Sequence, residues 1–374
     1  MSAAHATVDL DDTEGLLDAD RDGLLRAAAT AGAQVRATAA AVEEGALESV
    51  AGDQRPRTVV WVAGRGPAES AGAMLAAALS GTTGAPIVTV AESPPWIGPL
   101  DVLIAAGDDP GDPALVGAAA IAVRRGARVV VAAPYEGPLR DATAGRAAVL
   151  APRLWVPDEF GLSRYLAAGL ATFSAVDPSV PAPLAELADS LDAEAARNSA
   201  AREVFTNPAK ALADRISGRP TVLAGDCAAT LALARHGAAV LLRVAGEPVA
   251  AAGLGDALAA LRTGIASRFG DSVDALFHDE EIDGPLPGRP RVVALALAAE
   301  RQTLSARVSG IDGVELIGAD DVGTGDVGAE EFSPGDLGAE TSGSAPGPGR
   351  VQDQLAILAL RLEMAAVYLR LAGG

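Results

Sequence analysis

The sequence predicts an α/β protein of two lobes, each a mostly parallel sheet flanked by helices. A repeated element gives the first indication: residues 55–66 read Arg-Pro-Arg-Thr-Val-Val-Trp-Val-Ala-Gly-Arg-Gly, and residues 218–226 read Gly-Arg-Pro-Thr-Val-Leu-Ala-Gly-Asp. Both contain a short β-branched run that ends in glycine and continues into Ala-rich sequence, as a strand followed by a helix does in a parallel sheet. Strand and helix patterns alternate along the chain, and Pro-rich sequence separates the two copies.

The first lobe is predicted over residues 1–180. Its opening stretch, residues 12–50, places leucines and valines at helical spacing among acidic residues, so we expect one or two amphipathic helices that pack on this lobe. The sequence then predicts helices at 67–80, 112–125 and 161–175, and strands at 58–63, 86–90, 101–106, 127–132 and 147–150. This alternation favours right-handed crossovers and a mostly parallel sheet.

The second lobe is predicted over residues 181–374, after a Pro-rich linker at 177–183. Asn207 and Pro208 are the residue types of a helix cap and a first helical position. The sequence also predicts helices at 184–200 and 351–371, and strands at 220–224, 238–244, 273–277, 291–297 and 313–317. Residues 318–349 are acidic, Gly-rich and poor in large apolar groups, so we expect a flexible loop there.

The composition excludes several classes of function. A formal net charge of −20 opposes binding to nucleic acid and to anionic membrane surfaces. Cys227 is the single cysteine and the histidines are His5, His236 and His278, which excludes disulfides and an ordinary Cys/His zinc site. The N-terminus has no secretion signal, and turn residues at 80–86 break the longest charge-free apolar stretch. We therefore expect a soluble cytoplasmic protein without nucleic-acid or membrane partners.

Several short segments carry a resemblance to a known family. They are Gly64-Arg-Gly-Pro-Ala-Glu-Ser70 after the first strand, Pro94-Pro-Trp-Ile-Gly-Pro99, Trp155-Val-Pro-Asp-Glu-Phe-Gly-Leu-Ser-Arg164, Asn207-Pro-Ala-Lys210, His278-Asp-Glu-Glu-Ile and Val367-Tyr-Leu. With the order of the predicted elements, they resemble the two-domain sugar isomerase (SIS) proteins, specifically bifunctional phosphoglucose/phosphomannose isomerases and the actinobacterial TobH-type proteins related to them. The resemblance covers nearly the whole chain and implies two SIS-like lobes.

The resemblance implies a sugar-phosphate aldose–ketose isomerase of the glucose/mannose 6-phosphate type, or a relative that binds another carbohydrate derivative. Such a reaction needs one group that opens the sugar ring, another that moves a proton between C1 and C2, and cations or amides that hold the phosphate. His278 is the candidate for ring opening, and Glu247, placed just after the strand predicted at 238–244, for proton transfer. A homodimer with no cofactor and no metal is implied. The substrate-binding candidates are Gly64, Arg65, Gly66, Ser70 and Arg164.

Each candidate also has a structural interpretation. His278 fits a solvated turn residue, Glu247 an exposed loop acid, and the two arginines surface charges. Lys210, the only lysine of the chain, would need burial to lower its pKa for catalysis, and its place in a capped helix start explains the motif. His236 ends an Ala-rich helical run, where a cation suits the helix dipole, and is interpreted as structural.

The segment after the third predicted strand departs from the family pattern. The phosphate loop of the family reads Ser-x-Ser-Gly-x-Thr, and its place here reads Ala106-Gly-Asp-Asp-Pro-Gly-Asp112. Carboxylates in place of hydroxyls repel a phosphate by about 1 to 4 kcal/mol. This acidic turn favours a second hypothesis, a non-catalytic SIS-domain protein that senses a sugar derivative or is a scaffold for a partner enzyme; a third is a purely structural dimer partner. The three aspartates also fit a divalent cation, although Pro110 and Pro113 first predict a turn and a helix cap.

Overall fold

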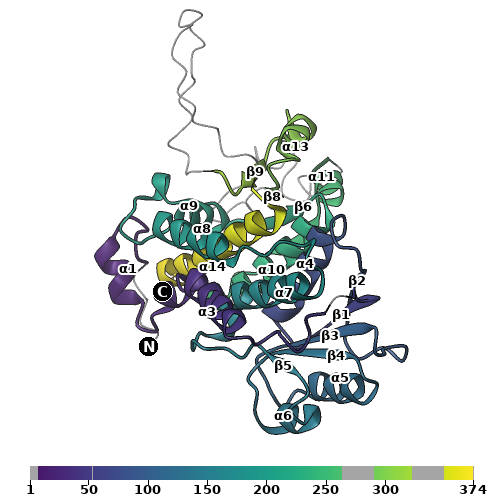
Figure 1. Ribbon diagram of the computed structural model, residues 1–374. Coiled ribbons are helices and arrows are strands. Elements are labelled where there is room, and N and C mark those ends of the chain that lie inside the picture. Colours follow the sequence, from purple (N-terminus) through teal and green to yellow (C-terminus); the bar gives the residue numbers. More distant parts are fainter. Residues whose placement is uncertain (1–6, 53, 263–289, 322–348, 374) are drawn as a thin grey trace, which may run out of the picture.

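Two parallel sheets face a shared layer of helices in the computed structural model (Figure 1). The structure describes residues 7–52, 54–262, 290–321 and 349–373. The strand order is β2-β1-β3-β4-β5 in the first sheet and β7-β6-β8-β9 in the second, and neighbouring strands are parallel in both. The strands are β1 Thr58–Ala63, β2 Ile87–Val90, β3 Asp101–Ala106, β4 Arg128–Ala132, β5 Ala148–Val149, β6 Thr221–Gly225, β7 Ala250–Gly253, β8 Arg291–Ala296 and β9 Val314–Gly318.

Helices connect the strands and fill the space between the sheets. They are α1 Thr13–Ala19, α2 Leu24–Ala28, α3 Ala31–Glu43, α4 Pro67–Leu79, α5 Pro113–Arg124, α6 Gly137–Thr143, α7 Leu162–Val176, α8 Leu184–Arg197, α9 Pro208–Ile216, α10 Ala228–Val240, α11 Leu254–Arg262, α13 Arg301–Val308 and α14 Val351–Gly373. Three shorter helical turns are η1 Asp158–Phe160, η2 Val204–Thr206 and the π-helical η3 Leu241–Ala245.

Alternating side chains divide each sheet between two cores, because successive residues of a strand point to opposite faces. Val59 and Trp61 of β1 face a central core with α4 and α7, whereas Val60 and Val62 face α5 and α6. The second sheet has α10 and α14 on its central face and α11 and α13 on its outer face. The central core therefore contains helices from both lobes, and apolar packing joins the lobes.

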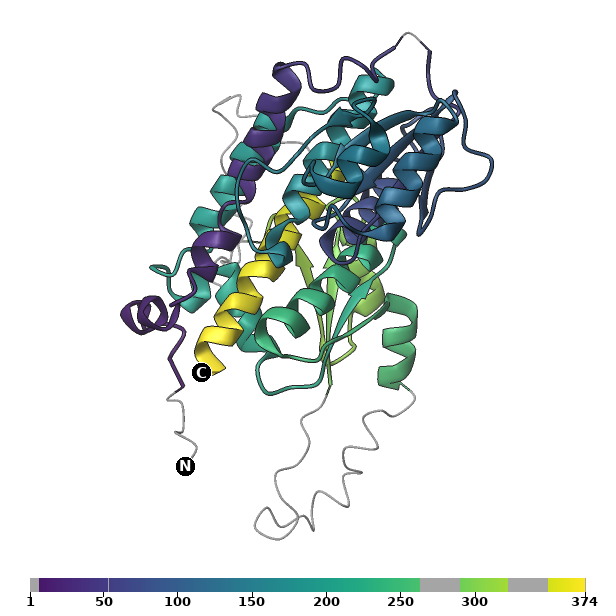
Figure 2. The same cartoon turned by 90° about the horizontal axis from the view of Figure 1, so that it is seen from below.

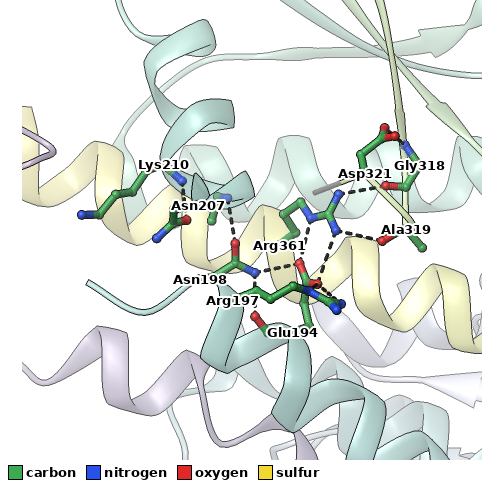
Figure 3. A network of polar contacts seen from close by, with 10 residues as sticks. Glu194, Arg197, Asn198, Asn207, Lys210, Gly318, Ala319, Asp321 and Arg361 are labelled. Carbon is green, nitrogen blue, oxygen red and sulfur yellow. Dashed lines mark hydrogen bonds and ion pairs between the residues drawn. The ribbon is translucent and has the colours of Figure 1, made fainter. Parts of the chain in front are cut away.

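Helix α14 runs through the middle of this core and packs against α8, α9 and α10 (Figures 1 and 2). Most of its residues are buried, which confirms the expectation that the last helix docks in the core. The buried residues include a charged one, Arg361. Figure 3 shows Arg361 beside Glu194 of α8 and the backbone of Gly318 and Ala319, where β9 ends. Polar contacts thus fix α14 to both α8 and the second sheet.

The helices before β1 contact both lobes. α3 lies against α7, as expected, but also against α8, and α1 and α2 contact α14. Arg36 of α3 forms ion pairs with Asp189 and Asp192 of α8. The amide of Val8 donates to the carbonyl of Ala372 at 3.3 Å, so the two ends of the described chain lie side by side (Figure 2). The expectation that this stretch packs on the first lobe therefore holds only in part, because α3 contacts both lobes and α1 and α2 contact the second.

The predicted α/β class with two parallel sheets is confirmed. The strands predicted at 58–63 and 101–106 match β1 and β3 residue for residue. Asn207 caps α9, because its Oδ1 accepts a hydrogen bond from the amide of Lys210 at 3.0 Å, and Pro208 is the first helical residue. Local patterns of apolar spacing and capping therefore predict most of the elements that bear on the site.

The strand predicted at 238–244 is wrong. These residues end α10 and form η3. The prediction failed because a short apolar run has no periodicity that separates a strand from a buried helix. β7 has no counterpart among the predicted strands. The strand predicted at 273–277 and most of the loop predicted at 318–349 lie outside the described residues. Within that loop, Gly318 ends β9 and Ala319 is buried, so both belong to the folded lobe.

Among the described residues, one helical stretch, Ala228–Ala245, is long and apolar enough to cross a membrane by length and composition alone. It comprises α10 and η3, and 56% of it is buried inside the protein. Its buried residues pack in the central core against β6 and α14. Core packing therefore accounts for its apolar composition.

Candidate functional site

A glycine turn follows β1. The amide of Gly64 extends the sheet by donating to the carbonyl of Ala106 at 2.7 Å. Gly66 has a φ of +86°, a region that favours glycine because a side chain would be strained there. Pro67 then begins α4, where a residue without an amide hydrogen is well suited. The turn thus places backbone at the carboxyl edge of the first sheet.

Three aspartates follow the neighbouring strand β3. Asp112 caps α5 by accepting a hydrogen bond from the amide of Ala114 at 2.8 Å, and Asp109 accepts one from the amide of Gly111 at 2.7 Å. These contacts match the predicted turn and helix cap. Across the described part of the chain, no group of three or more His, Cys, Asp or Glu side chains is arranged to hold a metal ion.

A cavity of about 490 Å³, called the sheet-edge cavity below, lies where the glycine turn and the acidic turn meet. β1 and β3 are adjacent and parallel, so their carboxyl ends share one edge, which is where ligands bind to open α/β sheets. The second lobe contributes one residue from η3. The lining residues are Gly64, Arg65, Gly66, Asp108, Asp109, Asp112, Asp158 and Arg243. Four carboxylates and two guanidinium groups therefore surround the same space.

Arg164 is paired with an aspartate of the acidic turn. Its Nη2 lies 2.5 Å from Oδ1 of Asp108 and donates to the hydroxyl of Tyr165 at 2.7 Å. The guanidinium also stacks on the ring of Tyr165, and burial raises the pKa of that phenol. Nη1 of Arg164 is buried and has no hydrogen-bond partner. With Asp108 and Asp158, Arg164 lines a smaller cavity of about 190 Å³ next to the sheet-edge cavity.

Asp158 and Arg243 belong to the site, although neither was a candidate from the sequence. Partial burial, and then the charges of Asp108 and Glu159, raise the pKa of the Asp158 carboxyl. Arg243 donates to Glu159 at 2.9 Å across the two lobes. Asp158 lies inside the segment 155–164 that carries the family resemblance, which was a usable signal. The incorrect strand at 238–244 hid the helical position of Arg243.

The structure brings Gly64, Arg65 and Gly66 together in the sheet-edge cavity. Ser70 instead lines a cavity of about 300 Å³ between α4 and α10, called the interlobe cavity below. Gly66 and Arg243 line both cavities, so the two spaces are neighbours. The predicted substrate-binding residues are therefore divided between adjoining cavities, with Arg164 behind the acidic turn.

Of the two predicted catalytic residues, Glu247 belongs to the part of the chain that the structure describes. Glu247 is half-buried after η3, and its amide donates to the carbonyl of Leu241 at 3.2 Å. It is not among the residues that line the sheet-edge or interlobe cavity. His278 lies outside the described residues.

Lys210 and His236 are both buried. Nζ of Lys210 donates to the carbonyls of Ala200 and Arg202, each at 2.8 Å, and burial lowers the pKa of the ammonium. The burial that a catalytic lysine needs is present, but these hydrogen bonds tie the lysine to the backbone before α9. Nε2 of His236 lies 3.1 Å from Oε1 of Glu363 on α14.

No protein-family model matches the sequence. No curated protein matches it either. Solved structures do match. A Silicibacter pomeroyi protein assigned as a phosphosugar isomerase has a TM-score of 0.58 at 15% identity, covering 92% of this chain and 96% of its own. The Escherichia coli tagatose-6-phosphate ketose/aldose isomerase has a TM-score of 0.57 at 15% identity, covering 99% and 95%. The C-terminal domain of the Francisella tularensis glucosamine-fructose-6-phosphate aminotransferase has a TM-score of 0.56 at 10% identity, covering 94% and 95%. The chain therefore shares its two-lobe fold with phosphosugar isomerases over nearly its whole length.

Proposed function

We propose that this protein binds a sugar phosphate or a related carbohydrate derivative in the sheet-edge cavity, as an aldose–ketose isomerase of the glucose/mannose 6-phosphate type. The observation that carries the proposal is the position of this cavity, at the carboxyl ends of adjacent parallel strands in a fold shared with phosphosugar isomerases. Under this proposal the protein is a cytoplasmic homodimer, and His278 opens the sugar ring as the family resemblance implies.

The charges in the cavity indicate how such a ligand is oriented. The acidic turn repels a phosphate, and Asp108 already balances the charge of Arg164. Arg65 and Arg243 are the cations that line the cavity, so the anionic group of the ligand lies on their side. Ionised carboxylates accept hydrogen bonds, so Asp109 and Asp112 face the sugar hydroxyls. The phosphate therefore lies away from the acidic turn, whereas the family resemblance would place it at this turn, where the family has its phosphate loop.

A coupled assay with glucose 6-phosphate, mannose 6-phosphate and fructose 6-phosphate tests turnover. Thermal-shift measurements with the same sugars, with unphosphorylated glucose, mannose and fructose, and with nucleotide sugars test binding. The proposal expects interconversion of at least one pair, with greater stabilisation by the phosphorylated sugar than by its unphosphorylated counterpart. The absence of both turnover and binding across this panel would contradict it.

A second candidate function is a non-catalytic protein that senses a sugar derivative or is a scaffold for a partner enzyme. The pairing of Arg164 with Asp108 favours it, because this pairing occupies a cation that the family resemblance assigns to the sugar phosphate. Thermal stabilisation by a sugar derivative without any turnover supports this second function over the first.

A further inference from the structure

The interlobe cavity has a buried histidine in its wall. It lies between α4, which contributes Ser70, and α10, which contributes Arg235 and His236. Only 2% of the His236 side chain is exposed to solvent. Because Gly66 and Arg243 also line the sheet-edge cavity, a ligand that fills the edge of the sheet can extend past Gly66 toward His236. The histidine therefore adjoins the proposed sugar site without belonging to its acidic wall.

His236 is held by a carboxylate from the core helix. Its Nε2 lies 3.1 Å from Oε1 of Glu363, a side chain that is 1% exposed. Burial raises the pKa of the Glu363 carboxyl, and the hydrogen bond from His236 opposes that rise. A buried ionisable pair is costly to desolvate, and apolar residues of similar volume would often pack at least as well. Packing alone therefore gives no reason for this pair in a core made mainly of Ala, Val and Leu.

The pair leaves one ring nitrogen available to a ligand. When Nε2 donates to Glu363, the neutral imidazole carries a lone pair on Nδ1. Within the described residues, the side-chain hydrogen bond of the His236 ring is the one between Nε2 and Glu363. A histidine that is oriented by a carboxylate through one nitrogen and lines a cavity has the geometry of a general base.

We propose that the bound sugar reaches into the interlobe cavity, and that His236 is the group that moves the proton between C1 and C2, with Glu363 as its positioning residue. This inference rests on the proposed isomerase function and takes the role that the sequence predicted for Glu247. The ligand is an open-chain sugar phosphate whose C1 and C2 lie beside the imidazole.

The reaction needs no oxidant or cofactor. Nδ1 takes the proton from C2 of the aldose, and the electrons of that bond form the C1–C2 double bond while the carbonyl pair moves to O1. The same proton then returns to C1, and the proton of the C2 hydroxyl passes to O1, which gives the ketose. Glu363 stabilises the transient imidazolium. Arg243, which lines both cavities, supplies positive charge for the enediolate.

Three variants test the assignment by kinetics. His236→Gln removes the base, and we expect kcat to fall about 100-fold or more while KM changes little. Glu363→Gln keeps the shape of the positioning residue and replaces its carboxyl group with an amide, so it should also lower kcat with little change in KM. Tyr368→Phe is the control, because Tyr368 is buried on the same helix and donates to the carbonyl of Asn198 at 2.6 Å, away from both cavities. Wild-type turnover by His236→Gln overturns the assignment and leaves the proposed isomerase function intact.

Nuclear magnetic resonance of ¹⁵N-labelled histidine gives a readout that does not depend on turnover. The chain has three histidines, so the His236→Gln variant assigns the signal. In the wild type we expect a ring protonated on Nε2, a change of this tautomer signature in Glu363→Gln, and a shift of the Nδ1 resonance when glucose 6-phosphate or fructose 6-phosphate binds. If the wild type isomerises no sugar, the proposed isomerase function is wrong. A shift of the Nδ1 resonance on adding the sugar phosphate would then still show that the ligand binds in the interlobe cavity. A saturating sugar phosphate that stabilises the protein and leaves the His236 signal unchanged overturns the inference.

Discussion

Arg164 and Asp108 are paired at 2.5 Å, and this pair defines the acidic side of the candidate site. The two side chains are 11% and 23% exposed, so water screens the pair less than it would on the surface. Arg164 lies at the position where the family resemblance implies contact with a sugar phosphate. In this protein the carboxylate of Asp108 is already paired with it. The charge available to an incoming phosphate is therefore smaller than the sequence suggests.

Asp108→Asn should release this guanidinium and remove one repulsive charge. We expect the affinity for glucose 6-phosphate to rise about tenfold, because one carboxylate near an anion costs roughly 1 to 4 kcal/mol. Isothermal titration calorimetry of the wild type and the variant measures the change. Asp192→Asn is the matched control, because Asp192 forms an exposed pair with Arg36 and is not among the residues that line the sheet-edge or interlobe cavity. An unchanged affinity in Asp108→Asn would show that the phosphate does not approach the acidic turn.

Arg65→Ala tests the opposite side of the cavity. Arg65 is exposed within the glycine turn and lines the sheet-edge cavity. We expect binding of a phosphorylated sugar to weaken by about 1.5 to 3 kcal/mol, the usual contribution of a hydrogen bond to a charged group. Arg164→Ala should weaken it less, because Asp108 neutralises that residue in the unliganded protein. The same titration compares the two variants. A larger loss of binding in Arg164→Ala than in Arg65→Ala would show that the anionic group of the ligand lies at Arg164.

The elements that frame the site were predictable because they depend on local patterns. β1 and β3 are continuous apolar runs, and Gly64 and Gly66 mark the point where β1 turns into α4. β7 was missed because Ala-Ala-Ala-Gly has little strand character of its own, and its conformation comes from pairing with β6. The apolar run at the end of α10 and in η3 is short, and such a run fits a strand as well as a buried helix.

The contacts that give the site its chemistry were not predictable from local pattern. Arg164 and Asp108 are 56 positions apart in the sequence, and His236 and Glu363 are 127 apart. The spacing along the chain does not encode such pairs, because the packing of whole elements brings them together. The sequence identified an arginine and an acidic turn, and only the fold shows that one neutralises the other.

Lys210→Met should destabilise the protein although it preserves the apolar stem. Nζ donates hydrogen bonds to the carbonyls of Ala200 and Arg202. Methionine has no donor at this position, so both carbonyls lose a hydrogen bond. We expect a loss of about 2 to 3 kcal/mol in the free energy of unfolding, measured by urea denaturation. Arg202→Ala is the control, because its side chain is exposed and only its backbone takes part. Equal losses in the two variants would contradict a specific role for the ammonium.

The pH dependence of stability should report the buried pair of Arg361 and Glu194. Nε of Arg361 donates to Oε1 of Glu194 at 2.8 Å, with the two side chains 2% and 0% exposed (Figure 3). Burial raises the pKa of the Glu194 carboxyl, but the charge of Arg361 and the hydrogen bonds from Arg361 and Arg197 outweigh burial, so the pKa lies below its ordinary value of 4.5. The ionised form is therefore the one that folding favours.

A lowered pKa in the folded state adds stability that is complete above the unfolded pKa and is lost as the pH falls through the folded pKa. Glu194→Gln cannot ionise, so it should be less stable than the wild type by about 3 kcal/mol at neutral pH. Below about pH 4.5 the difference in the free energy of unfolding should shrink, because the carboxyl of Glu194 in the wild type becomes protonated and neutral, as the glutamine of the variant is at every pH. Urea denaturation of both proteins across this range measures the difference, in which the titration of all other carboxylates cancels. Glu186→Gln is the control, because Glu186 is 70% exposed in its pair with Arg350 and should give a small, nearly constant difference. A Glu194→Gln difference that stays constant or grows on acidification would show that the carboxyl of Glu194 is not held ionised by Arg361.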